Sequence, residues 1–281
     1  MRLAIPTVFI LCSLWPACLA QTASSVNAPL PDPHELLQRA LANEKKLAVE
    51  QERYECRVTT QTIQTDKNGK VKKDETEVDD QFYVNGMEID RTLSKNGKEL
   101  TGDGARKEDE RVMKKTVKYS DKAYADKQQA KQDQQVEDFM AAMQLENGHR
   151  EIVNGRSVLF YDIVPNPHFD AKNLNQKFAT AMQGKIAVDE KTGEMIDLNI
   201  KSVRDIKIGG GLLANLHKGF WLHVHQSAHP DGVWLTDLAE GSGDARAMLF
   251  IHPYFRFKST TDGCHLYTTN AQQVGGATVV K

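Results

Sequence analysis

Three Asn-Gly pairs constrain the fold of this chain more than any other feature: Asn68-Gly69, Asn85-Gly86 and Asn96-Gly97. Asn and Gly tolerate the positive φ that tight β-hairpins require. The segments around these pairs are rich in β-branched and aromatic residues, which favour strands; they are Tyr54–Thr65, Val71–Val84 and Met87–Leu93. We therefore expect an antiparallel meander, and the many charged residues in its strands predict that one face is solvated.

The stretch from Gly155 to Arg204 predicts more strands of the same kind. Ser157–Val164 is a β-rich run that stops at Pro165, and Lys185–Asp189 is expected to pair with Glu194–Val203 across a short turn. Later β-rich runs predict four further strands: Phe220–Ala228, Val233–Leu238, Ala245–Lys258 and His265–Asn270. The expected fold class is mainly β, of the α+β type, with one large antiparallel sheet.

Three segments have the apolar spacing of helices that cover a sheet. The first follows Asp32, which can cap a helix that begins with Pro33. The second covers residues 121–145; its first half is polar on all sides and its second half is amphipathic. The third covers residues 173–182, while the polar segment Thr101–Glu110 is expected to form a loop.

The N-terminus has the pattern of a targeting segment. It combines the basic Arg2, an apolar run too short to span a bilayer, and small residues before a cleavage site after Ala20. Cys18 leaves acylation as a lipoprotein as an alternative. No second apolar run approaches the ~20 residues of a membrane-spanning helix, so we expect export as a soluble protein. The expected segments are a signal peptide over 1–20, a disordered lead over 21–31, one domain over 32–270 and a frayed tail over 271–281.

Two cysteines remain after such a cleavage, Cys56 and Cys264. They lie in or beside the first and last strong strand candidates, and exported proteins meet an oxidising environment in which cysteines can pair. A disulfide would tie the two ends of the sheet together and stabilise the fold by about 2–4 kcal/mol. Two unpaired, half-buried thiols are the alternative.

Charge and motifs argue against several classes of function. The net charge is −2 with both signs interspersed, which argues against a nucleic-acid partner. His223 and His225 share one face of a strand, as two metal ligands could, but no metal-binding motif accompanies them. Gly241-Ser242-Gly243 lacks the spacing of a serine hydrolase and is expected to form a turn. We therefore predict no catalytic residue, no metal and no cofactor.

The middle of the chain resembles a known family. Val158–Pro165 reads Val-Leu-Phe-Tyr-Asp-Ile-Val-Pro, a short helix follows, and Gly184–Asp189 reads Gly-Lys-Ile-Ala-Val-Asp before a turn and an alternating strand. This pattern is similar to the bacterial periplasmic lipoprotein-carrier (LolA/LolB-like) superfamily and its outer-membrane lipoprotein-sorting relatives. The resemblance spans residues 33–270. It implies a periplasmic protein whose large curved antiparallel sheet forms an unclosed barrel, covered by the three helices.

The resemblance also implies an apolar cavity that binds a lipid or the acyl chains of a lipidated protein, without catalysis. Its candidate lining residues are large apolar side chains: Phe139, Met140, Met143, Phe160, Trp221, Trp234, Met248 and Phe250. Strand position alone does not say which of them face inward. Two other functions stay open: an envelope interaction module that docks through the charged meander Tyr54–Leu100, and a metal-dependent enzyme built on His223 and His225.

Overall fold

The computed structural model describes the chain apart from residues 1–27, 209–213, 248–253, 267–270, 275–276 and 281. The helices are α1 (Pro33–Gln51), α2 (Gly102–Ser120), α3 (Lys122–Ala141) and α4 (Leu174–Ala179). The strands of the first half are β1 (Tyr54–Thr65), β2 (Val71–Val84), β3 (Met87–Lys95), β4 (Lys98–Glu99), β5 (Met143–Val153) and β6 (Arg156–Pro165). Those of the second half are β7 (Met182–Asp189), β8 (Met195–Ser202), β9 (Ile206–Ile208), β10 (Ala214–Leu216), β11 (Trp221–Ala228), β12 (Trp234–Ala247), β13 (Tyr254–Leu266), β14 (Ala271–Val274) and β15 (Ala277–Val280).

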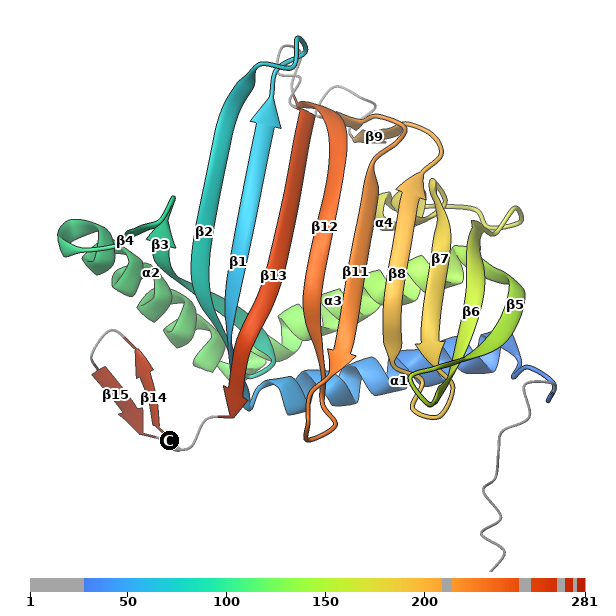
Figure 1. Cartoon of the computed structure of the whole chain (residues 1–281), viewed down its shortest axis with the longest axis horizontal. Coiled ribbons are helices and arrows are strands. Elements are labelled where there is room, and N and C mark those ends of the chain that lie inside the picture. The colour runs from blue at the N-terminus through green and yellow to red at the C-terminus, as the bar shows by residue number, and fades with distance from the viewer. Residues whose placement is uncertain (1–27, 209–213, 248–253, 267–270, 275–276, 281) are drawn as a thin grey trace, which may run out of the picture.

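One large antiparallel sheet dominates the described chain (Figure 1). Its strands follow the order β4-β3-β2-β1-β13-β12-β11-β8-β7-β6-β5, and β10 and β9 join it beside β12. The two ends of this order, β4 and β5, remain separate edges, so the sheet is not closed into a barrel. The predicted fold class, mainly β with a large unclosed antiparallel sheet and a few helices, is confirmed.

The meander predicted from the Asn-Gly pairs is confirmed. β1 pairs with β2, and β2 pairs with β3, all antiparallel. Asn85 and Asn96 adopt φ of 50° and 52°, and the glycines that follow them also have positive φ. Because few other residues tolerate this conformation, these turns place the hairpins from local sequence alone.

Helices α1 and α3 run across one face of the sheet and leave the opposite face of the central strands uncovered (Figure 1). Asp32 caps α1, because its Oδ1 accepts hydrogen bonds from the backbone N–H groups of His34 and Glu35 at 2.8 and 3.1 Å. Leu36 of α1 is buried and belongs to the same core cluster as Leu159 of β6. These contacts hold α1 over the β5–β8 end of the sheet. None of the helices in the described residues has the length and apolar character needed to span a membrane.

The loop expected over Thr101–Glu110 is wrong, because α2 begins at Gly102. Local glycines and polar residues make this segment look irregular in the sequence. An ion pair one turn apart, between Arg106 and Glu110 at 2.6 Å, supports its exposed face. Val112 is buried in a cluster with Phe82 and Ile89 of the meander. Tertiary packing therefore favours the helix over local preference.

The other two predicted helices are shorter than expected. The helix over 121–145 ends at Ala141, and Met143–Val153 is the edge strand β5. Short apolar runs do not distinguish a helix from a buried strand, and here pairing of Leu145 with Ile163 decides for the strand. The helix over 173–182 spans only Leu174–Ala179, after which β7 begins.

Gly241-Ser242-Gly243 is not a turn but lies inside β12. A Cβ at Gly241 would lie 2.7 Å from the carbonyl oxygen of Trp221 and 2.9 Å from the ring of Phe257. A Cβ at Gly243 would similarly meet the ring of Phe220 at 2.9 Å. These glycines therefore leave room for aromatic rings that lie across the strand, a packing reason that the local sequence does not reveal.

Residues 271–281 were expected to fray, whereas β14 and β15 pair as a separate two-stranded antiparallel hairpin. The predicted signal peptide over 1–20 lies outside the described residues, as do residues 21–27 of the lead predicted over 21–31. Cys56 and Cys264 form a disulfide that joins β1 to β13, as predicted.

Substitution of Gly184 by alanine is expected to destabilise the fold. A Cβ there would lie 1.9 Å from the carbonyl oxygen of Asn199 and 2.7 Å from the Cα of Ile200, both backbone atoms of β8. Overpacking of this kind costs about 1–3 kcal/mol, and Tm should fall by roughly 2–12 °C. Thermal denaturation checks this against Gly104→Ala in α2, whose Cβ would meet only a Leu100 side-chain atom at 3.2 Å. Equal Tm values for the two variants would contradict the close approach of the β8 backbone to Gly184.

Candidate ligand-binding groove

A groove of about 430 Å³ lies between α1, α3 and the β5–β8 end of the sheet. All of its lining residues are apolar except two glutamines of α3: Leu37, Ala40, Leu41, Gln132, Gln135, Val136, Phe139, Met140, Met143, Leu145, Ile163, Ile186, Met195 and Leu198. Sites for small ligands typically measure about 300–1,000 Å³. The groove therefore has the size and the character of a site for an apolar ligand.

Helical spacing explains the two helical walls. On α1, Leu37, Ala40 and Leu41 stand at positions i, i+3 and i+4 and so share one face. On α3 the lining residues run from Gln132 to Met140 with the same spacing, so their polar members lie at one end and their apolar members at the other. The amphipathic half of α3 is thus the part that covers the groove.

The lining residues of β5, β6, β7 and β8 form the floor of the groove, and the pairing of these strands explains their positions. Leu145 of β5 pairs with Ile163 of β6, and Ile186 of β7 pairs with Leu198 of β8. Paired residues in neighbouring antiparallel strands point to the same face of a sheet. Ile163 pairs with Gly184 of β7, so the two pairs lie diagonally to each other on this face and form an apolar patch over four strands beneath the helices.

A buried carboxylate fixes the end of α3 over this floor. Asp138 is 7% exposed and accepts hydrogen bonds at 2.8 Å from the side-chain amides of Gln176 and Asn173. Asn173 is the N-cap of α4, and the two residues form its capping box. The amide donors of Gln176, Asn173 and Gln134 hold the pKa of Asp138 below its ordinary value. Asp138 thus ties α3 to α4 beside the groove.

A second polar contact holds the segment before α1. Arg150 of β5 is nearly fully buried, and its Nε donates to Glu190 at 2.7 Å. Its Nη1 donates to the carbonyl oxygen of Ala28 at 2.6 Å, and Nη2 to that of Pro29 at 3.3 Å. Hydrogen bonds to a charged donor are stronger than neutral ones. Arg150 therefore positions the chain just before the helix that forms one wall of the groove.

The groove contains only part of the set of residues predicted from sequence. Phe139, Met140 and Met143 line it, although Met143 does so from β5 instead of a helix. Phe160 does not line it: the alternation along β6 points it to the uncovered face, where it stacks with His149 at 5.3 Å.

Trp221 also lies beside outward-facing polar residues, among them Glu240 and Lys258. Trp234 is buried in a different cluster with Leu47, Tyr54 and the disulfide, and its ring lies under Arg156. Met248 and Phe250 lie outside the described residues. That Phe139, Met140 and Met143 contact a bound ligand stays a prediction.

Sequence reasoning missed most of the floor. Ile163 and Ile186 belong to strands that were recognised, but they are smaller than the aromatic residues that drew attention. The alternation Leu159, Tyr161, Ile163 along β6 was the available signal, because all three are buried. The alternation of side chains along β6 identifies its buried face, whereas the size of a side chain does not.

No protein-family model and no curated protein matches the chain. Among solved structures, an outer membrane lipoprotein-sorting protein domain from Vibrio parahaemolyticus matches over 84% of this chain and 94% of its own, with 11% identity and a TM-score of 0.34. A DUF1329 family protein from Desulfovibrio piger matches over 85% and 96%, with 8% identity and a TM-score of 0.30. At these TM-scores neither match carries an argument about the family or the function of this chain.

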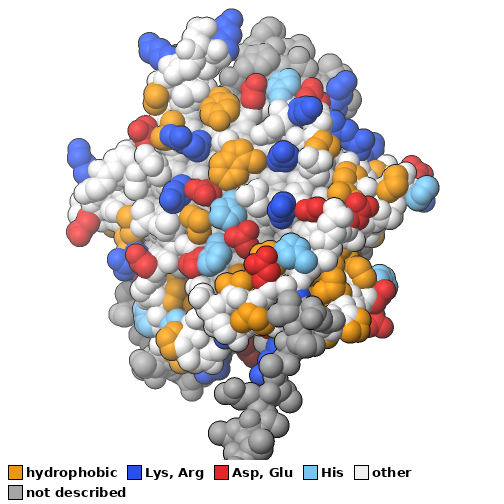
Figure 2. Space-filling view, turned by 45° about the vertical axis from the view of Figure 1, so that its right-hand side comes forward, with side chains coloured by type: hydrophobic (Ala, Val, Ile, Leu, Met, Phe, Trp, Pro, Cys, Tyr) orange, Lys and Arg blue, Asp and Glu red, His pale blue; other side chains and the backbone are white. Residues whose placement is uncertain are grey.

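The histidines proposed as metal ligands lie on the uncovered face of the sheet. His223 Nε2 lies 2.7 Å from Asp197 Oδ2 and its Nδ1 lies 3.3 Å from Glu240 Oε1, while His225 Nδ1 lies 2.7 Å from Asp237. Figure 2 shows histidine, acidic and basic side chains interspersed on the face that it presents. In the part of the chain that the structure describes, no group of three His, Cys, Asp or Glu residues is arranged to hold a metal ion.

These contacts predict a pH-dependent contribution to stability. Asp197 and then Glu240 raise the pKa of His223 above its ordinary value of 6.5. A raised pKa in the folded state means that the contribution is complete below pH 6.5 and is lost as pH rises through the raised pKa. Wild-type Tm should fall more between pH 6 and 8 than that of His223→Gln, as measured by thermal denaturation. The control His168→Gln, on an exposed loop, should keep the wild-type slope; an unchanged slope in His223→Gln would refute the prediction.

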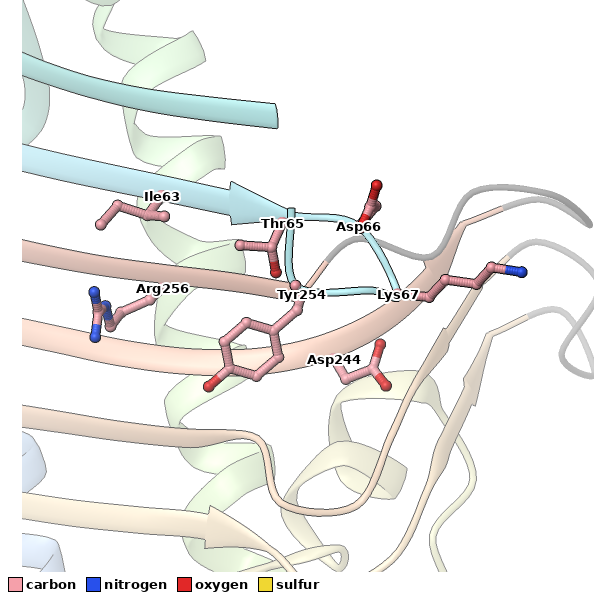
Figure 3. A pocket seen from close by; sticks show the side chains of 8 residues that line it. Ile63, Thr65, Asp66, Lys67, Asp244, Tyr254 and Arg256 are labelled. Carbon is pink, nitrogen blue, oxygen red and sulfur yellow. The ribbon is translucent and has the colours of Figure 1, made fainter. Parts of the chain in front are cut away.

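Another hollow, of about 670 Å³, lies at the far end of β1 and β13 (Figure 3). Its lining includes Asp66, Lys67, Tyr254 and Arg256. In Figure 3 these side chains do not converge: Lys67 extends away from Arg256. A binding site needs convergent groups, so this hollow offers a poorer site than the apolar groove.

Proposed function

We propose that this protein is an exported, non-catalytic periplasmic carrier that holds a lipid, or the acyl chain of a lipidated protein, in the apolar groove. The observation that carries the proposal is the lining of the groove, in which Gln132 and Gln135 are the sole polar residues among those described. Such a lining offers non-directional burial, worth about 0.8 kcal/mol for each CH₂ group removed from water. It supplies neither a nucleophile nor an acid-base group.

The methionines of the groove suit a ligand of variable shape. Met140, Met143 and Met195 reach it from α3, β5 and β8. Unbranched thioether side chains adapt to irregular apolar surfaces. The two glutamines at one end can donate to a polar head group, while the chain itself lies against Leu198 and its neighbours.

A chain-length series tests this proposal. Isothermal titration with octanoate, decanoate and dodecanoate should show affinity rising about fourfold for each added CH₂. Acetate serves as the control because it carries the same carboxylate without the chain. Affinity that does not depend on chain length would overturn the proposal.

The alternative of docking through the charged meander has less support. Many of its charges are already paired with neighbours on the same sheet: Arg57 with Asp80 at 2.8 Å, and Lys73 with Glu75 at 2.9 Å. A docking partner would have to replace these pairs with its own, and the exchange of one exposed pair for another gains little energy. A partner that binds the meander while the groove takes no acyl ligand would favour this alternative.

A further inference from the structure

The face of the sheet that carries the apolar groove also holds a second compartment, of about 430 Å³. The pairing register places it on this face: Ser259 pairs with Ala239, Ala239 with Val224, and Val224 with Leu198 in the floor of the groove. The lining residues come from the end of α1 and from β1, β2, β3, β11, β12 and β13: Gln51, Tyr54, Cys56, Val58, Thr60, Asp79, Gln81, Tyr83, Glu88, Asp90, Gln226, Leu235, Thr236, Ala239, Ser259 and Thr261.

This second compartment is separate from the groove. Both touch α1, the groove at Leu41 and the compartment at Gln51, which at 1.5 Å per residue lie about 15 Å apart along the helix. Leu47 lies between them and is buried in a cluster with Trp234. A ligand of one compartment therefore need not occupy the other.

The chemistry of the compartment is the opposite of that of the groove. Its floor carries hydroxyl groups, among them Thr60 and Ser259, whose oxygens lie 2.8 Å apart. Its β2–β3 end carries the carboxyls of Asp79, Glu88 and Asp90. The described lining contains no Lys, Arg or His. These groups suit a ligand that donates hydrogen bonds and carries positive charge.

Two buried acceptor oxygens lack partners at opposite ends of the compartment. Asp79 of β2 is 9% exposed and Gln226 of β11 is 5% exposed, and within the described chain neither Asp79 Oδ1 nor Gln226 Oε1 has a hydrogen-bond partner. Buried polar atoms are nearly always paired, so an unpaired one calls for an explanation. Both atoms can only accept, so a bound donor would satisfy each of them.

Asp79 also has no direct ion pair, although a hydrogen bond from Thr92 and the charges of Lys95 and Arg111 partly stabilise its carboxylate. Burial, followed by the negative charges of Asp90, Glu77 and Glu108, raises its pKa. The nearby cation Arg111 is committed to Glu108 through bonds of 2.8 and 2.6 Å, and it also donates to the backbone carbonyl of Asp90. Among the described residues no ion pair involves Asp79. An ammonium group of a ligand would supply the direct ion pair that Asp79 lacks.

The positions of the two oxygens set the length of such a ligand. β2 and β11 are four steps apart in the sheet, in the order β2-β1-β13-β12-β11. At about 4.8 Å per step, the span is roughly 19 Å along the sheet and less across its curvature. The hydroxyl floor lies between the two ends.

We propose that this compartment binds an extended polyamine, with one ammonium group at Asp79 and Asp90 and the other end near Gln226. The intermediate amines then donate to the hydroxyl floor. An organic cation fits better than a metal ion, because the described residues contain no group of three ligands placed to hold a metal.

Titration calorimetry with spermine and 1,3-diaminopropane at one ionic strength tests the proposal. Spermine should bind the wild-type protein, and the short diamine should bind at least about tenfold more weakly, because it cannot reach both ends. Asp79→Asn should weaken spermine binding at least about tenfold, and Gln226→Met about fivefold. The control Asp74→Asn removes the same charge from an exposed position of the same strand and should change affinity less than twofold.

Three results would overturn the proposal: no binding of spermine at millimolar concentration, equal affinity for the two amines, or equal losses in Asp79→Asn and Asp74→Asn. The Tm of each variant shows whether it folds. Gln226→Met removes an acceptor at the other end of the compartment, so the proposal stays testable if Asp79→Asn does not fold. Acyl-chain binding in the groove is measured in a separate titration, so its result does not affect the test of polyamine binding.

Discussion

Replacement of Ala40 by tryptophan is expected to weaken acyl-chain binding by about 15- to 60-fold. Ala40 lines the groove from α1, and the indole would occupy part of its 430 Å³. Exclusion of two or three CH₂ groups from the groove removes about 0.8 kcal/mol each, which gives this range. Titration with dodecanoate measures the loss directly.

Ala42→Trp is the matched control, because Ala42 lies on the same helix but is exposed. It should leave the affinity for dodecanoate unchanged. Spermine binding should also survive Ala40→Trp, since the polar compartment begins at Gln51. If the two tryptophan variants bind dodecanoate equally well, the groove is not the binding site.

Removal of the disulfide should have the largest effect on stability. Cys56 and Cys264 are separated by 208 residues, and their bond joins β1 to β13, the first and the last strand of the described sheet in chain order. A bond that closes so long a loop restricts the unfolded chain and stabilises the native state by about 2–4 kcal/mol. The double variant Cys56→Ala/Cys264→Ala should therefore lose roughly 4–16 °C in Tm.

The same protein provides the control for this prediction. A reducing agent should lower the urea midpoint of the wild-type protein toward that of the double variant, and it should not affect the double variant itself. A double variant as stable as the oxidised wild-type protein would show that strand pairing between β1 and β13 is sufficient without the bond.

The strands were easier to predict from sequence than the site. Asn85-Gly86 and Asn96-Gly97 place two turns of the meander because positive φ is a local requirement. The segment before α3 was misread because Val112 gains its helix-stabilising burial from Phe82 and Ile89, which are distant in sequence. The predicted elements agree with the structure where neighbouring residues determine them. They differ where packing between distant segments determines them.

The candidate site shows the same division. Phe139 and Met140 line the groove because helical spacing puts them on one apolar face. Phe160 and Trp221 were proposed for the cavity from their positions on strands, yet they lie on the uncovered face. Alternation along a strand separates two faces, but it does not say which of them the helices cover.

By itself, the sequence determined the hairpin turns, the capped first helix, the mainly β class and the pair of cysteines that can bond. Each depends on backbone preferences or on residues that act wherever the fold brings them. The tertiary structure alone decided that Leu145, Ile163, Ile186 and Leu198 form one floor, and that Asp79 and Gln226 share a polar compartment. The reason is that strand register and the side on which α1 and α3 pack are set by contacts between segments far apart in the chain.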